Sequence, residues 1–153
     1  MTATVLYASS DIAANKEPNQ MEPTSYPQLC KGTILVMDDD AMMQKLFSIM
    51  LESLGYASVC TSEGAETLRL YKRARDDGRP FAGVILDLHN RLGKDGIETL
   101  VDLRELDMEV KAAICTADAD APVMDQFLSY GFRGVLAKPF GLDDLGNLLK
   151  HIL

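Results

Sequence analysis

The stretch Gly83 to Leu88, which reads Gly-Val-Ile-Leu-Asp-Leu, decides the fold of this chain. Four residues without a polar side chain run unbroken into Asp87, and such a run without alternation is typical of a strand covered on both faces. Aspartate is depleted in strands and costly to bury unpaired, so we expect Asp87 to lie where the sheet opens into a crevice. Open α/β sheets hold their ligands in such crevices.

The composition is that of one globular domain. The 153 residues are 47% hydrophobic and 25% charged, with a net charge of −8. This negative charge argues against nucleic acid or an anionic membrane as the main partner, because both bind proteins through clustered lysine and arginine. Three widely spaced cysteines, and a start that matches no signal peptide or transmembrane helix, predict a cytoplasmic protein with free thiols.

Strand and helix patterns alternate along most of the chain. Residues 1–30 hold three prolines among polar residues and are expected to form a flexible extension, which leaves residues 31–153 as the domain. Strands are predicted at 33–37, 56–60, 81–87, 110–116 and 134–137, and helices at 42–54, 62–77, 96–106, 122–130 and 142–153, with Ser62 near the start of the second helix.

This alternation predicts an α/β fold of the flavodoxin-like (βα)5 type in a single domain. The expected sheet has five parallel strands in the order 2-1-3-4-5, with helices on both faces. In that order the topological switch point lies between the first and third strands, which are the strands that end in acids.

Carboxylates should therefore converge at the switch point. Asp38 and Asp39 follow the first strand, and Asp87 ends the third. Three close carboxylates repel one another and are not expected to stay ionised unaided. A divalent cation would relieve that repulsion, and magnesium (or manganese) suits an oxygen ligand set that a phosphate completes.

Two other strand ends supply groups that a phosphoryl group needs. Thr116 ends the fourth strand with a hydroxyl donor, and Lys138 follows the fifth with a cation that reaches phosphate oxygens. With Asp87 as an in-line nucleophile, this set supports phosphoryl transfer that yields an aspartyl phosphate.

These residues resemble the receiver domain of two-component response regulators. The likeness runs from about residue 31 to residue 153 and is carried by Ile34-Leu35-Val36-Met37-Asp38-Asp39-Asp40, Val84-Ile85-Leu86-Asp87-Leu88, Thr116-Ala117 and Lys138-Pro139-Phe140. It is strongest to receivers of hybrid sensor histidine kinases, through Leu54-Gly55-Tyr56, Gly78-Arg79-Pro80-Phe81, Pro122-Val123-Met124 and Tyr130-Gly131-Phe132.

The resemblance implies a role for each site residue. Asp87 would be phosphorylated, Asp39 would bind magnesium directly and Asp38 mainly through water, the backbone carbonyl of His89 would complete the protein ligands, and Thr116 and Lys138 would contact the phosphoryl group.

It also implies a signalling domain rather than an enzyme, with at most slow autodephosphorylation. A histidine kinase or a phosphotransfer protein would donate the phosphoryl group. Residues 123–153 would form the face that responds, and a homodimer through this face is a further expectation.

Two positions depart from the family pattern. Arg91 stands where proline is usual, in a loop one residue longer than the commonest form, and we expect it to make that loop more mobile. Val135 stands where a tyrosine or phenylalanine usually turns inward, which questions the usual relay from threonine to aromatic residue.

Simpler interpretations exist for each motif taken alone. The run Asp38 to Asp40 also fits a helix N-cap, Asp87 a turn, Thr116 an ordinary strand residue and Lys138 an exposed lysine. All four motifs occur in the expected order, each at the end of the expected strand, and this joint match favours a shared phosphoryl-transfer pocket over the simpler interpretations. His89 fits a solvent-exposed loop as well as a role in hydrolysis of the acyl phosphate.

Two other functions stay open as alternatives. One is a receiver-like docking module that is not phosphorylated. The other is a magnesium-dependent phosphohydrolase, which the chain order disfavours, because such enzymes usually carry the nucleophile on the first strand and an acidic pair late in the chain.

Overall fold

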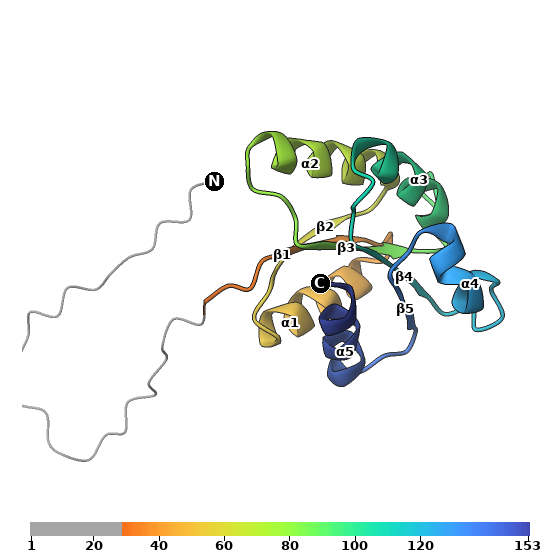
Figure 1. Ribbon diagram of the computed structural model, residues 1–153. Coiled ribbons are helices and arrows are strands. Elements are labelled where there is room, and N and C mark those ends of the chain that lie inside the picture. Colours follow the sequence, from red (N-terminus) through yellow and green to blue (C-terminus); the bar gives the residue numbers. More distant parts are fainter. Residues whose placement is uncertain (1–28) are drawn as a thin grey trace, which may run out of the picture.

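The computed structural model describes residues 29–153, so nearly all of the extension predicted at residues 1–30 lies outside the described residues. Five strands alternate with five helices (Figure 1). Their bounds are β1 (Thr33–Met37), α1 (Ala41–Ser53), β2 (Ala57–Thr61), α2 (Gly64–Asp76), β3 (Gly83–Asp87), α3 (Gly96–Leu106), β4 (Ala112–Thr116), α4 (Val123–Tyr130), β5 (Gly134–Ala137) and α5 (Leu142–Ile152).

The five strands form one parallel sheet in the order β2-β1-β3-β4-β5, as predicted. β1 and β3 are adjacent, and Met37 of β1 pairs with Leu86 of β3. Asp87, the next residue of β3, pairs with Cys115 of β4. The carboxyl ends of β1, β3 and β4 therefore meet at one edge of the sheet, which is where ligands bind in this architecture.

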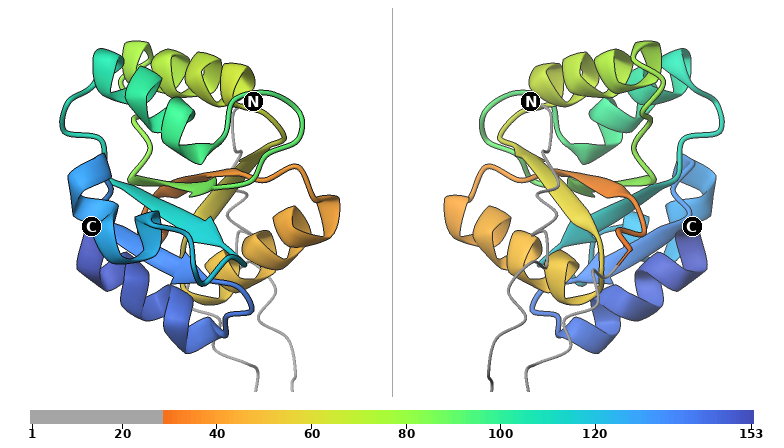
Figure 2. Two further views of the ribbon diagram at one scale, coloured as in Figure 1. Left: turned by 90° about the vertical axis from the view of Figure 1, so that its right-hand side faces the viewer. Right: turned by 90° about the vertical axis from the view of Figure 1, so that its left-hand side faces the viewer.

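Helices cover both faces of the sheet (Figure 2). Along β1 the side chains of Ile34 and Val36 point to one face and join a cluster with α1 and α5. Those of Leu35 and Met37 point to the other face, toward α2, α3 and the start of α4. All five residues of β3 are buried, which accounts for its unbroken apolar run.

The last helix belongs to the core. Leu145, Leu148, Leu149 and Ile152 are all buried against the sheet. These four side chains are therefore not free to form the homodimer contact expected for this part of the chain.

The predicted bounds of several elements were wrong by one or two residues. α2 begins at Gly64 with Glu63 as its N-cap, whereas Ser62 lies outside the helix and accepts a hydrogen bond from Gln44. The third and fourth strands begin two residues later than predicted, because Phe81 and Val110 pack against the core before strand pairing starts. Within residues 29–153, no helix has both the length and the apolar content needed to cross a membrane.

Candidate functional site

The three predicted carboxylates lie together at the carboxyl edge of the sheet. One carboxylate oxygen from each of Asp38, Asp39 and Asp87 lies within 4.8 Å of the other two. The side chains are only 1%, 7% and 8% exposed, respectively. Neighbouring water therefore screens their mutual repulsion poorly.

Lys138 bridges two acids of this cluster. Its ammonium group donates hydrogen bonds to Oδ2 of Asp38 at 2.9 Å and to Oδ1 of Asp87 at 3.1 Å. Burial alone would lower the pKa of Lys138, but the hydrogen bond to Asp38 and the charge of Asp87 outweigh it and raise this pKa to about 12. The lysine is therefore charged at neutral pH, in direct contact with the acid expected to react.

Asp87 titrates differently from an ordinary aspartate. Its burial, followed by the charge of Asp38, raises the pKa of Asp87 above the usual value, although Lys138 opposes the shift. A carboxylate that is costly to ionise gains more than a solvated one when an added cation or a covalent bond removes its charge.

The acidic run after β1 is divided between two roles. Oδ1 of Asp38 accepts a hydrogen bond from the backbone N–H of Asp40 at 2.9 Å, which orients Asp38 toward the pocket. Asp40 itself is the N-cap of α1, and its carboxylate accepts from the N–H of Met42 at 2.8 Å. The helix-cap interpretation is thus correct for Asp40, whereas Asp38 and Asp39 face the other acids.

A glycine allows α3 to begin directly against the backbone of Asp87. A Cβ atom at Gly96 would lie 2.6 Å from the carbonyl oxygen of Asp87 and 2.6 Å from Ile114. The helix start is held by a reciprocal pair of hydrogen bonds between Asp95 and Glu98. This packing fixes the position of the end of β3 and so of the Asp87 side chain.

Thr116 and His89 lie at the same edge, but their contacts are with the loop after β4. The Thr116 hydroxyl, which is buried, accepts a hydrogen bond from the N–H of Asp118 at 3.0 Å and keeps its own proton to donate. Nε2 of His89 lies 3.7 Å from a carboxylate oxygen of Asp118, and its side chain is 65% exposed. The expected roles of Thr116, the His89 ring and the His89 carbonyl remain predictions.

Arg91 makes a contact that the sequence did not predict. Its Nε donates to Oδ2 of Asp39 at 2.8 Å, and its backbone N–H approaches the same oxygen at 3.2 Å. The hydrogen bond from Arg91 lowers the pKa of Asp39, so this carboxylate stays ionised. We expected Arg91 only to loosen the loop in place of proline, whereas the structure makes it a counter-ion in the pocket.

The donor set fits a divalent cation. Three carboxylates carry three negative charges, and Lys138 and Arg91 supply two positive charges, so the cluster keeps a negative excess. Clustered carboxylate oxygens are the ligands that magnesium prefers in proteins. Asp38, Asp39 and Asp87 are the residues that would hold it.

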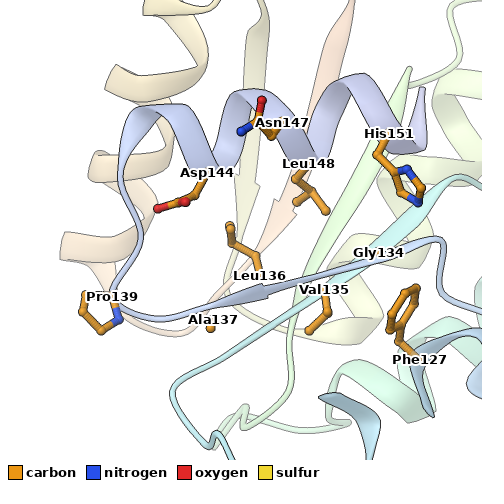
Figure 3. A pocket seen from close by; sticks show the side chains of 10 residues that line it. All are labelled: Phe127, Gly134, Val135, Leu136, Ala137, Pro139, Asp144, Asn147, Leu148 and His151. Atoms are coloured by element: carbon orange, nitrogen blue, oxygen red, sulfur yellow. The ribbon is translucent and has the colours of Figure 1, made fainter. Parts of the chain in front are cut away.

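A groove of about 480 Å³ lies on a separate face, between α4, β5 and α5 (Figure 3). Val135 and Leu136 of β5 form its floor, and Phe127 and His151 stand at one end. Val135, the position where the family usually has an inward-turning aromatic residue, thus faces an open groove. Ala137 and Pro139, the two neighbours of Lys138 in the chain, also line this groove. The backbone on both sides of Lys138 therefore links the groove to the acidic cluster.

Comparisons with known proteins agree with the geometry. A family model for the response regulator receiver domain matches residues 34–150. The probable C4-dicarboxylate response regulator DctR of Bacillus subtilis is 29% identical over 119 residues, which cover 76% of this chain and 50% of that protein. Sporulation initiation phosphotransferase F of the same organism is 27% identical over 120 residues, covering 78% and 92%.

Among solved structures, the receiver domain of a sensor histidine kinase from Pseudomonas aeruginosa PAO1 superposes with a TM-score of 0.69 at 25% identity. The match covers 79% of this chain and 96% of that domain, which was crystallised with a magnesium ion coordinated in its active-site cleft. The chain spans half or less of the length of the first curated relatives that it matches.

Proposed function

The chain belongs to the response regulator receiver domain family, whose members are signalling domains of two-component systems, and on that premise we propose that it accepts a phosphoryl group on Asp87. The donor is a histidine kinase or a histidine phosphotransfer protein, and the output is altered binding to a partner. One observation carries the proposal: Asp87 is a buried carboxylate in contact with Lys138 and beside two further acids. Residues 31–153 form the proposed domain, and three free thiols are in keeping with a reducing, cytoplasmic location.

The transfer follows from the groups present. A carboxylate oxygen of Asp87 attacks the phosphorus of a phosphohistidine while the bond from phosphorus to the imidazole nitrogen breaks. The imidazole leaves with the electron pair and takes a proton from solvent. Lys138 already touches Asp87, so its ammonium group stabilises the charge that gathers on the transferred oxygens, and the Thr116 hydroxyl has a free proton to donate.

Magnesium, or manganese in its place, would be held by Asp38, Asp39 and Asp87, with the carbonyl of His89 as the further protein ligand. When bound, the ion neutralises charge on the transferred group and on the carboxylates around it. The protein's own part is to hold the three carboxylates and Lys138 in place before the donor arrives.

A surface on α1 suits the donor protein. Met42, Leu46 and Ile49 are spaced by four and three residues, so they share one face of the helix, and their exposed fractions are 73%, 37% and 54%. The helix begins directly after the acids of the pocket, so a donor helix packed on this face would bring its histidine close to Asp87. The variant Ile49→Arg should slow transfer from a phosphorylated histidine phosphotransfer protein but leave phosphorylation by acetyl phosphate unchanged.

The groove between α4 and α5 is the proposed output surface. Phosphorylation of Asp87 gives Lys138 a new, more negative partner, and a shift of Lys138 moves Ala137 and Pro139, which line the groove. A homodimer through this face would have to use groove residues such as Phe127 and Val135, since four apolar side chains of α5 are in the core: Leu145, Leu148, Leu149 and Ile152.

Acetyl phosphate tests the proposal without a donor protein. Purified protein with magnesium should gain one phosphoryl group by intact mass, and the Asp87→Asn variant should gain none. Beryllofluoride binding distinguishes a phosphoacceptor domain from a docking module that is not phosphorylated, because only an intact acidic pocket should bind this reagent. If the wild type takes up neither reagent, the protein is a docking module and the proposal fails.

A further inference from the structure

We propose that Arg91 is a built-in competitor of the divalent cation, which must displace the guanidinium group from Asp39 in order to bind. The inference rests on the proposed metal site but not on phosphorylation itself. It assigns to Arg91 a role in setting how tightly, and at what ionic strength, the pocket binds its metal.

The contact is directed at one of the carboxylates that the cation needs. Oδ2 of Asp39 accepts from both Nε and the backbone N–H of Arg91, at 2.8 and 3.2 Å. Asp39 is also one of the three residues whose oxygens converge. A metal ion bound to this carboxylate and a guanidinium group bonded to it repel each other, so the two cations compete for Asp39.

The loop around Arg91 holds the residue in position for this contact. The side-chain amide of Asn90 donates to the carbonyl oxygen of Ser62 at 2.8 Å, and its oxygen accepts from the N–H of Leu92 at 2.8 Å. The first bond ties Asn90 to the loop after β2, and the second holds Leu92, on the other side of Arg91, to Asn90. The arginine therefore returns to Asp39 whenever the metal leaves.

The two cations of the pocket differ in how easily they can be displaced. The Lys138 side chain is 18% exposed and bridges two buried acids. The Arg91 side chain is 83% exposed, while the Asp39 side chain beneath it is 7% exposed. Arg91 can therefore swing into solvent without breaking any core packing, and Lys138 cannot.

The test is a magnesium titration of wild type and the Arg91→Gln variant by calorimetry at low ionic strength. Loss of the competitor should tighten magnesium binding by about two- to fivefold, the range expected from losing one exposed ion pair. The difference in affinity should shrink in high salt, because the Arg91 side chain is 83% exposed. In the wild type, the NMR resonance of the Arg91 Nε–H should shift as magnesium saturates the site.

The Lys94→Gln variant is the matched control. Lys94 lies in the same loop and its removal changes the net charge equally, but its partner is Asp102 of α3. Its effect on magnesium affinity should be clearly smaller than that of Arg91→Gln.

Three results would overturn the inference. Equal magnesium affinities of the wild type and Arg91→Gln would show that Arg91 does not compete with the metal, and would leave the proposed function intact. A change in Lys94→Gln as large as in Arg91→Gln would show that general charge, not the contact, sets the affinity. No magnesium binding by any variant would refute the metal site itself and, with it, this inference.

Discussion

The acidic pocket should lower the stability of the metal-free protein, and Asp87→Asn should recover that loss. The substitution keeps the shape of the side chain and an oxygen for Lys138, but it removes one of three converging negative charges. We expect the variant to be more stable than the wild type at pH 7 in the absence of magnesium, although it cannot be phosphorylated.

The size of the effect follows from the geometry. With an effective dielectric constant of about 20, each of the two acids within 4.8 Å of Asp87 repels it by about 3.5 kcal/mol, and Lys138 at 3.1 Å attracts it by about 5 kcal/mol. These three contributions sum to a repulsion of about 2 kcal/mol, which burial of the charge increases and the nearby charge of Arg91 reduces. Since Asn forms a weaker hydrogen bond with the lysine, we expect a net gain of about 1–2 kcal/mol.

Thermal unfolding in EDTA measures this gain, which corresponds to a rise in Tm of about 4–8 °C. The pKa of Asp87 is raised in the folded state, so the native protein binds more protons than the unfolded chain between the unfolded and folded pKa values. The wild type therefore loses stability as the pH rises through this window. The advantage of the variant should be present above the folded pKa and should vanish below the unfolded one.

The control is Asp120→Asn, which removes the same charge from an exposed loop at the same edge of the sheet. It should change Tm little. The reasoning would be refuted if Asp87→Asn were no more stable than the wild type, or if its advantage did not depend on pH. Magnesium should reduce the difference in Tm between Asp87→Asn and the wild type, since it binds the folded wild type and stabilises it.

Three further predictions concern other parts of the domain. Lys138→Met should destabilise the metal-free protein by about 1–3 kcal/mol in urea unfolding, because it leaves two buried carboxylates without their shared donor; unchanged stability would contradict the pairing. Burial raises the pKa of the Cys115 thiol to about 12, so at pH 8 this thiol should react with a disulfide reagent only after unfolding, whereas the exposed Cys30 should react at once. Asp95→Ala should lower the free energy of unfolding by about 1 kcal/mol, because it removes the reciprocal cap of α3. Unchanged stability in the same urea assay would contradict this prediction.

The acidic cluster and the fold share one origin. Strand order puts the ends of β1 and β3 side by side, and burial of the strands on both faces leaves their ends as the place where polar groups can gather. For this reason Asp38, Asp87 and Lys138 could be grouped from their places after apolar runs, before any contact was known. The same reasoning overestimated the lengths of β3 and β4, since apolar residues before a strand pack in the core without joining the ladder.

Arg91 illustrates what such reasoning misses. From the sequence, Arg91 stands where the family usually has proline, and this predicted only a more mobile backbone in its own loop. The bond to Asp39 joins residues 52 positions apart in the chain, in loops that follow different strands. The length of the loop and the anchor of Asn90 on Ser62 decide where the guanidinium group lies.

The amino-acid sequence by itself determined the succession of strands and helices, the parallel sheet and the set of acids at the strand ends. These follow from periodicity and chain order, which are local and which the rules of parallel sheets turn into a topology. Only the tertiary structure decided that Asp40 caps α1 while its neighbours face the pocket, that Arg91 closes on Asp39, and that Val135 faces an open groove. Such contacts depend on how loops and helices pack over the finished sheet, where differences of an ångström select the partner of a side chain.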